Sequence, residues 1–207
     1  MILTRLLSIM TSERLTKQLE FILEIDKLKR IMRQTLLTVD RSHENDAEHS
    51  WHIALMTLLL SEYSTESNLD IQKVIKMVLI HDIIEIDAGD TFCYDYKAGK
   101  DKKERELVAA ERIFTILPED QAQDFRDVWD EFEEMQSSEA KFAAAMDRLQ
   151  PLLLNFNTEG ESWRKHGVSR SQVIQRNEHI KNGSAVLWDF ASWLIDESVR
   201  RGYLQDK

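Results

Sequence analysis

The scarcity of chain breakers is the feature that most constrains this fold. Only two prolines and six glycines occur in 207 residues, while Leu, Ile, Ala, Glu, Lys and Met recur throughout. Most of these residues favour helices, and no strand-like alternation of apolar and polar residues stands out. The chain is long enough to bury one substantial core, and no repeat or low-complexity segment divides it. We therefore expect a single all-α domain.

Apolar residues at helical spacing predict the individual helices. The first is expected from Ser12 to about Arg33 behind a Ser/Thr cap, after an N-terminal extension at residues 1–11. A polar loop at 40–46 then ends in Asp46 as the expected N-cap of the second helix. The third helix begins behind Asn68 or Asp70 and closes near Gly89. Helices are predicted at about 47–63, 104–117, 119–136, 138–155, 169–182 and 184–201, with loops at 91–103 and 157–168.

Charge and cysteine content narrow the possible functions. A net charge of -10 argues against binding a nucleic-acid polymer, which requires a basic surface. One arginine and a metal could still create a local positive site for a small anion. Cys93 is the only cysteine, which excludes an intramolecular disulfide and a thiolate zinc cluster. The short apolar N-terminus lacks the features of a signal peptide or membrane anchor, so we expect a cytoplasmic protein.

The dipeptide His81-Asp82 carries the clearest chemical signal. It ends a strongly apolar run that begins at Val78. Burying an ionisable pair there is costly unless something binds it. A divalent cation with nitrogen and oxygen ligands would provide that compensation. With six histidines in the chain, one such pair is close to chance expectation, so its significance depends on companions elsewhere.

His49 and Asp147 are the candidate companions. His49 lies one turn into a helix on its apolar face, where a hydrogen-bonded core histidine is an equal alternative. Asp147 interrupts an otherwise apolar helix, so its burial needs a cation or several donors. A salt bridge to a neighbouring helix is the alternative, whereas Arg148 projects about 100° away and is a poor partner. Together His49, His81, Asp82 and Asp147 suit a catalytic Mn, Co, Fe, Ni or Zn ion with open positions, and not a structural zinc.

The order of these residues resembles the HD-domain metal-dependent phosphohydrolases, and most closely their bacterial 5′-deoxynucleotidase branch. The resemblance covers about Leu15 to Leu154. It implies an HD-domain helical bundle over residues 12–207, with the metal-site core at about 33–155 and C-terminal helices at about 169–201. It rests on Arg33, Glu48-His49, His81-Asp82, Glu85, Asp90 and Asp147.

The resemblance also implies roles for single residues. His49, His81, Asp82 and Asp147 would be the metal ligands. Glu85 would orient and deprotonate the attacking water, Asp90 would support it, and Arg33 would bind the substrate phosphate. Alternatives stay open: Glu85 as a histidine partner, Asp90 as a turn residue, and Arg33 as a helix C-terminal cation. Glu48 and His52 are possible supports of the ligands, although a buried structural role is favoured for His52. His43, His166 and His179 are expected at the surface or in loops, and Tyr94, Tyr96 and Lys97 are candidates for the substrate mouth.

The expected activity is hydrolysis of a small phosphomonoester, most plausibly a nucleoside 5′-monophosphate. In characterised deoxynucleotidases a Trp follows the phosphate-binding arginine and helps to exclude ribose. Gln34 follows Arg33 here, so selectivity for deoxy sugars stays open. The alternatives are an HD phosphohydrolase for a polyphosphate, an alarmone or a cyclic nucleotide, and a metal-containing binding module without turnover. A homodimer is expected because the helices offer more apolar faces than one core needs.

Overall fold

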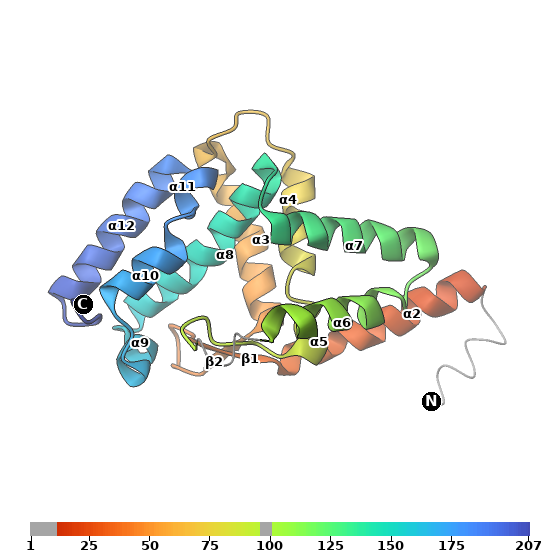
Figure 1. Cartoon of the computed structure of the whole chain (residues 1–207), viewed down its shortest axis with the longest axis horizontal. Coiled ribbons are helices and arrows are strands. Elements are labelled where there is room, and N and C mark those ends of the chain that lie inside the picture. The colour runs from red at the N-terminus through yellow and green to blue at the C-terminus, as the bar shows by residue number, and fades with distance from the viewer. Residues whose placement is uncertain (1–11, 96–100) are drawn as a thin grey trace.

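The computed structural model describes residues 12–95 and 101–207. The predicted extension at 1–11, and with it Tyr96 and Lys97, lies outside the described residues. Within the described ranges, helices build nearly all of the fold and one short antiparallel strand pair accompanies them (Figure 1). The prediction of an all-α fold is confirmed. None of the described helices combines the length and hydropathy that a membrane crossing requires.

The first predicted helix is shorter than expected. Helix α2 (Glu13–Ile25) begins behind Ser12, whose side chain accepts a hydrogen bond from the Leu15 backbone N–H. A 3-10 turn, η1 (Asp26–Arg30), follows, and the chain then extends into strand β1 (Met32–Leu36). Strand β1 pairs with β2 (His43–Asn45), with an irregular register between the two paired ends. The prediction that a helix reaches Arg33 is therefore wrong, and Arg33 is no helix-terminal cation.

Helix α3 (Asp46–Leu60) carries the first predicted ligand. Its N-cap is Asn45, which forms a reciprocal capping box with Glu48. Asp46 is therefore not the cap, contrary to the prediction; it is the first helical residue, and its side chain is buried. A short 3-10 turn, η2 (Ser61–Tyr63), follows the helix.

The predicted third helix is divided into two. Helix α4 (Ile71–Ile80) begins behind Asp70, whose side chain accepts from the Lys73 backbone N–H. His81 ends this helix as its C-cap, and a turn at 81–84 separates it from α5 (Glu85–Ala88). Gly89 then takes a positive φ of 74°, a conformation that a side chain disfavours. The turn places His81, Asp82 and Glu85 close together in the chain's interior.

The remaining helices follow the predicted order with two differences. The predicted loop at 157–168 contains a short helix, and the predicted helix at 169–182 is two helices. The elements are α6 (Lys102–Phe114), α7 (Glu119–Glu134), α8 (Ser138–Asn157), α9 (Glu161–His166), α10 (Arg170–Asn177), α11 (Ile180–Gly183) and α12 (Ala185–Arg200).

Helix α8 is the central element of the fold. It packs against α3 and α4 on one side and against α10, α11 and α12 on another, and Figure 1 shows it crossing the middle of the molecule. The residues from Phe142 to Met146 are all buried. Gly183 of α11 lies so close that an added Cβ would fall 2.6 Å from the Lys141 carbonyl oxygen. This packing fixes the position of Asp147, the residue that follows the buried run.

Candidate metal centre and substrate cavity

Two histidines and one aspartate from three helices meet in the interior. His49 comes from α3, His81 from the end of α4 and Asp147 from α8, and one ligand atom of each lies within 4.8 Å of the others. Asp147 Oδ1 is 3.0 Å from His49 Nε2 and 3.7 Å from His81 Nε2. All three side chains are buried. The structure thus brings together three of the four predicted ligands in one compact group.

Asp82 joins this group to a second one. Its Oδ1 lies 3.0 Å from His81 Nε2, and its Oδ2 lies 3.9 Å from His49 Nε2. Asp82 also belongs to a buried carboxylate triad with Asp46 and Glu85, whose oxygens lie within 4.8 Å of one another. All four predicted ligands therefore surround one small volume, with Glu85 on the side of the triad.

Hydrogen bonds from the far ring nitrogens set the orientation of both histidines. His81 Nδ1 lies 2.9 Å from the Val78 carbonyl oxygen, and His49 Nδ1 lies 3.1 Å from Gln150 Oε1. Both partners are acceptors, so each Nδ1 carries the hydrogen and donates it. In the neutral ring the lone pair is then on Nε2, which faces the carboxylates. This is the tautomer that a metal-binding histidine requires.

The electrostatic environment favours a neutral ring at His49 and a positive charge at His81. Burial, and next the charge of Arg33, lower the pKa of His49 to about 4, so that its imidazole stays neutral. At His81 burial acts in the same direction, but Asp82 and Asp147 outweigh it and raise the pKa to about 10. His81 Nε2 is nevertheless buried without a hydrogen-bond partner among the described residues. A proton and a divalent cation compete for such a nitrogen.

The surrounding acids carry more negative charge than the local cations balance. Burial raises the pKa of Glu44 and of Asp46 to about 7 each, and that of Glu85 well above its ordinary value. One oxygen each of Asp46 and Glu85 is buried without a hydrogen-bond partner in the described part of the chain. Desolvated carboxylates at this density either take up protons or bind a cation. The mixed nitrogen and oxygen donors fit a divalent transition metal.

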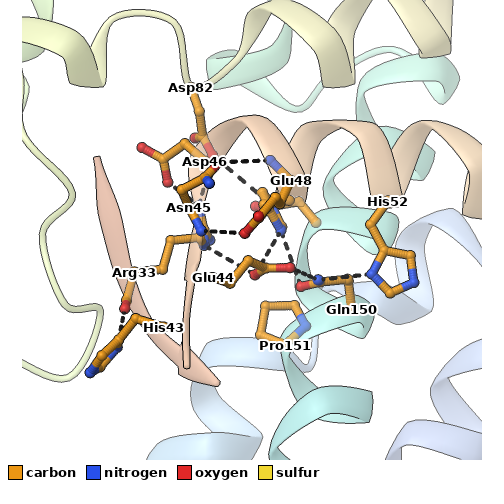
Figure 2. Close-up of polar contacts among 12 residues, drawn as sticks. Arg33, His43, Glu44, Asn45, Asp46, Glu48, His52, Asp82, Gln150 and Pro151 are labelled. Atoms are coloured by element: carbon orange, nitrogen blue, oxygen red, sulfur yellow. Dashed lines mark hydrogen bonds and ion pairs between the residues drawn. The ribbon is translucent and has the colours of Figure 1, made fainter. Parts of the chain in front are cut away.

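Arg33 is the cation that the protein itself supplies. From strand β1, its Nη1 donates to Asp82 Oδ2 at 2.7 Å and to Asp46 Oδ1 at 3.1 Å, as Figure 2 shows. Burial opposes its charge, but the carboxylates, Asp82 foremost, raise its pKa above the ordinary value. The side chain is 13% exposed, and its Nε has no hydrogen-bond partner among the described residues. This nitrogen is buried 3.8 Å from Glu44 Oε2, so the exposed remainder of the guanidinium group is the part that can face a ligand.

A cavity opens beside the candidate metal ligands. Arg33, His81, Asp82, Glu85 and Asp147 form part of its wall, and the half-buried Asp90 lies on it as well. A pocket of mixed aromatic and polar character next to clustered titratable groups is the usual setting of a small-molecule site. Further wall residues include Gln34, Phe92, Tyr94, Lys102, Arg148, Trp163 and Arg176.

The family follows from a match along most of the chain. Residues 25–188 match the sequence model of the HD domain. The chain belongs to the HD-domain family. A solved structure of a predicted metal-dependent phosphohydrolase from Magnetospirillum magnetotacticum is similar to it, with 54% sequence identity and a TM-score of 0.89. That match covers 93% of this chain and 96% of the other.

Curated relatives of this HD-domain chain are more distant. The human 5′-deoxynucleotidase HDDC2 is 28% identical over 137 residues, which are 65% of this chain and 65% of the relative. The 5′-deoxynucleotidase ECA3034 of Pectobacterium atrosepticum is 28% identical over 121 residues, or 55% and 60% of the two chains. The chain thus spans less than two thirds of the length of these relatives. The predicted resemblance to HD-domain phosphohydrolases is confirmed.

The structure differs from two of the predictions made for residues around the HD-domain site. Glu48 is exposed, and its carboxylate accepts from the Asn45 backbone N–H in the capping box, away from the ligands. Arg148, expected to be a poor partner, donates from Nη1 to Asp147 Oδ2 at 2.6 Å. The long guanidinium side chain bends back to the adjacent carboxylate, so the 100° between the two Cα directions does not prevent contact.

Several residues of the site were not predicted. Gln150 bonds to His49, donates to Glu44 Oε1 at 2.5 Å and lies 3.2 Å from His52 Nδ1 (Figure 2). His52 is half-buried, and Gln150 links it to His49. Gln150 could have been predicted from the sequence, because it is a polar residue one turn beyond Asp147 in an apolar helix.

The other histidines lie around the cavity. His43 is on strand β2, half-buried, with Nδ1 2.6 Å from the Arg33 carbonyl oxygen. His166 is exposed at the end of α9, and its Nε2 lies 3.1 Å from Gln34 Oε1. His179 is half-buried between α10 and α11. The exposed His166 and the turn residue His179 agree with the prediction of surface or loop positions, whereas His43 lies on a strand.

Proposed function

We propose that this HD-domain protein is a metal-dependent phosphohydrolase that acts on nucleoside 5′-monophosphates, deoxynucleotides among them. One observation carries the proposal: two imidazole nitrogens and the Asp82 and Asp147 carboxylates converge at a cavity wall that also presents the Arg33 guanidinium. The names of the relatives, 5′-deoxynucleotidase and predicted metal-dependent phosphohydrolase, support the same reaction class.

The metal would be held by His49, His81, Asp82 and Asp147. A bound Mn, Co, Fe, Ni or Zn ion would supply Lewis-acid stabilisation of the charge that develops on the phosphoryl group. The donor set does not select among these ions.

The protein's own residues would position the substrate and move the proton. Arg33, which lines the cavity, would donate from its guanidinium group to a phosphoryl oxygen and neutralise part of its charge. Glu85 would accept the proton of the attacking water, because its carboxylate lies on the cavity wall beside Asp82. Asp90, half-buried on the same wall, would support Glu85. The attack then proceeds in line with the leaving nucleoside oxygen.

Sugar selectivity is the finer part of the proposal. Gln34 lines the cavity directly after Arg33, and His166 Nε2–H donates to its amide oxygen. The Gln34 side chain is smaller than a Trp, and its amide oxygen already accepts a hydrogen bond from His166. The activities on ribose and deoxyribose substrates must therefore be compared directly.

Phosphate release tests the activity. The purified protein with Mn or Co is expected to release phosphate from a panel of ribo- and deoxyribonucleoside 5′-monophosphates. Glu85→Gln should retain the metal and lose about 10²–10⁴-fold in kcat, whereas Asp147→Asn should lose metal and turnover together. Glu66→Gln, an exposed glutamate after η2, is the matched control. Bound metal with no phosphate released from any substrate would contradict the proposal and favour a binding module.

A further inference from the structure

A second group of cations lines the cavity, apart from Arg33. Arg148 of α8 and Arg176 of α10 both contribute to its wall, and these two helices pack against each other (Figure 1). Arg148 is 19% exposed; its Nη1 bonds to Asp147, while its Nε is buried without a hydrogen-bond partner among the described residues. Two guanidinium groups therefore face one cavity in a chain with a net charge of -10.

Arg176 has no counter-ion within the described ranges. It is half-buried, and neither a hydrogen bond nor an ion pair joins it to another described side chain. Burial foremost, and next the charge of Arg148, lower its pKa. The charge of Asp147 acts in the opposite direction without outweighing them. Burial raises the pKa of Tyr94, and burial with both arginines lowers that of His179 to about 4. Both groups are neutral near pH 7.

Arg176, which has no ion pair of its own, and Arg148, which is paired with Asp147, line the same cavity as the Asp82 and Glu85 carboxylates. Like charges in a desolvated wall destabilise the fold unless an ion of opposite sign binds between them. Arginine is the side chain best suited to that ion when it is a phosphate, because its planar donors match the phosphate oxygens.

The two arginine sites flank the metal-ligating group from different sides. Asp82 presents Oδ1 to His81 and Oδ2 to Arg33, whereas Asp147 presents Oδ1 to His49 and Oδ2 to Arg148. A phosphate bound at Arg33 therefore leaves Arg148 and Arg176 free to bind another anionic group. The wall of the same cavity includes the aromatic side chains of Phe92, Tyr94 and Trp163.

We propose that Arg148 and Arg176 form a second anion subsite, which binds a second phosphate group of the substrate. The preferred substrates are then nucleotides with two phosphate groups, either a 5′-diphosphate or a 3′,5′-bisphosphate. For the bisphosphate, water cleaves one phosphate ester to yield a nucleoside monophosphate and inorganic phosphate, while the other phosphate stays bound. This inference deepens the proposed function and rests on it for the reaction, but not for the binding.

Anion binding tests the subsite without turnover. Pyrophosphate and inorganic phosphate are titrated calorimetrically into the full chain, once with Mn and once with EDTA. Pyrophosphate is expected to bind about tenfold or more tightly than phosphate, the effect of one charge-assisted hydrogen bond. Arg176→Gln should abolish this preference, and Arg176→Lys should restore part of it. Arg170→Gln, at a half-buried arginine of the same helix that is paired with Asp196, should leave it unchanged.

The two proposals fail in different ways. If Arg176→Gln loses the pyrophosphate preference while wild type and Arg170→Gln keep it, the subsite is supported. This holds even if no phosphate is ever released from a nucleotide. An equal preference in wild type and Arg176→Gln, or none in wild type, overturns it even if the nucleotidase activity is present. In the active enzyme, kcat/KM for the diphosphate and bisphosphate relative to the monophosphate should fall in Arg176→Gln; whichever ratio falls further identifies the position of the second phosphate.

Discussion

At the scale of single residues, Gln150 determines which histidine nitrogen is available. Its amide oxygen accepts from His49 Nδ1–H, and its amide nitrogen is held by Glu44. Rotating the amide by 180° would place two donors against each other at His49 and two acceptors at Glu44. The amide is therefore fixed in one orientation, and the His49 Nε2 lone pair points at the metal-ligating group.

Gln150→Leu is expected to weaken metal binding, and to cost about 1–3 kcal/mol of stability for each buried group that it leaves unpaired. The leucine removes the acceptor for His49 Nδ1–H, so the ring is free to rotate or change tautomer. The dissociation constant for Mn or Co should rise about 10–100-fold, measured by competition with a chelating indicator. Gln123→Leu, at an exposed Gln–Asp pair of α7, is the control. Equal affinities in wild type and Gln150→Leu would refute the orienting role.

Residues whose chemistry is unusual for their surroundings were predictable from the sequence. His49, His81, Asp82 and Asp147 interrupt apolar helix faces, and the structure gathers all four. Arg176 was not predictable, because an arginine on a polar helix has many ordinary explanations. Its significance lies in the absence of a partner among the described residues, which only the packing of α10 against α8 reveals.

At the scale of elements, strand β1 explains why the first helix was predicted too long. The apolar spacing of α2 continues locally past Ile25, so local pattern gives no reason to end the helix. What ends it is pairing with β2, residues 43–45, across a turn. Such non-local hydrogen bonds leave no local signal in the sequence. The pairing also buries Thr35 and Leu36 and directs Arg33 toward Asp82.

Gly183→Ala is expected to destabilise the contact between α11 and α8. The added methyl group would fall 2.6 Å from the Lys141 carbonyl oxygen and 2.9 Å from Phe142 Cα, both backbone atoms that move only with the helix. We expect a loss of about 1–3 kcal/mol in the free energy of unfolding, or about 2–4 °C in Tm for each kcal/mol. Thermal unfolding followed by circular dichroism measures it.

The neighbouring Asn182→Ala provides the comparison. Asn182 is exposed on the same short helix, so its Tm should change by less than about 2 °C. If Gly183→Ala leaves Tm unchanged as well, the backbones of α8 and α11 are free to separate.

At the scale of the whole molecule, folding concentrates negative charge. Segments near residues 44–46, 82–85 and 147 are far apart in the sequence, yet their carboxylates surround one buried volume. In the unfolded chain these acids are solvated and distant from one another. The folded protein without metal therefore bears a repulsion that the unfolded chain lacks.

Divalent metal is accordingly expected to raise Tm, and EDTA to reverse the rise. A metal at 100 times its dissociation constant adds about 2.7 kcal/mol to the free energy of unfolding. Differential scanning calorimetry of wild type with and without Mn or Co measures this shift, with NaCl at matched ionic strength as the control. Asp147→Asn should show a much smaller rise. A metal-independent Tm in wild type would contradict the charge argument.

Exposed apolar stripes on two helices bear on the expected homodimer. Helix α3 exposes Trp51, Leu55, Leu58 and Leu59 on one face, and α12 exposes Val186, Phe190 and Trp193. If two chains associate through such a stripe, the fraction of chains that sediment as monomer should fall to one half when the total protein concentration reaches the dissociation constant of the dimer. Leu59→Glu should shift that concentration upward if α3 forms the contact, as analytical ultracentrifugation would show.

The carboxylate triad has a consequence for the protein's lifetime in a cell. Proteases degrade chains in proportion to the time that they spend unfolded, and that fraction falls as a bound ligand stabilises the native state. Because Arg33 offsets only part of the repulsion among Asp46, Asp82 and Glu85, newly made chains in a metal-starved cell would be degraded sooner. The abundance of the polypeptide would then report the supply of its metal.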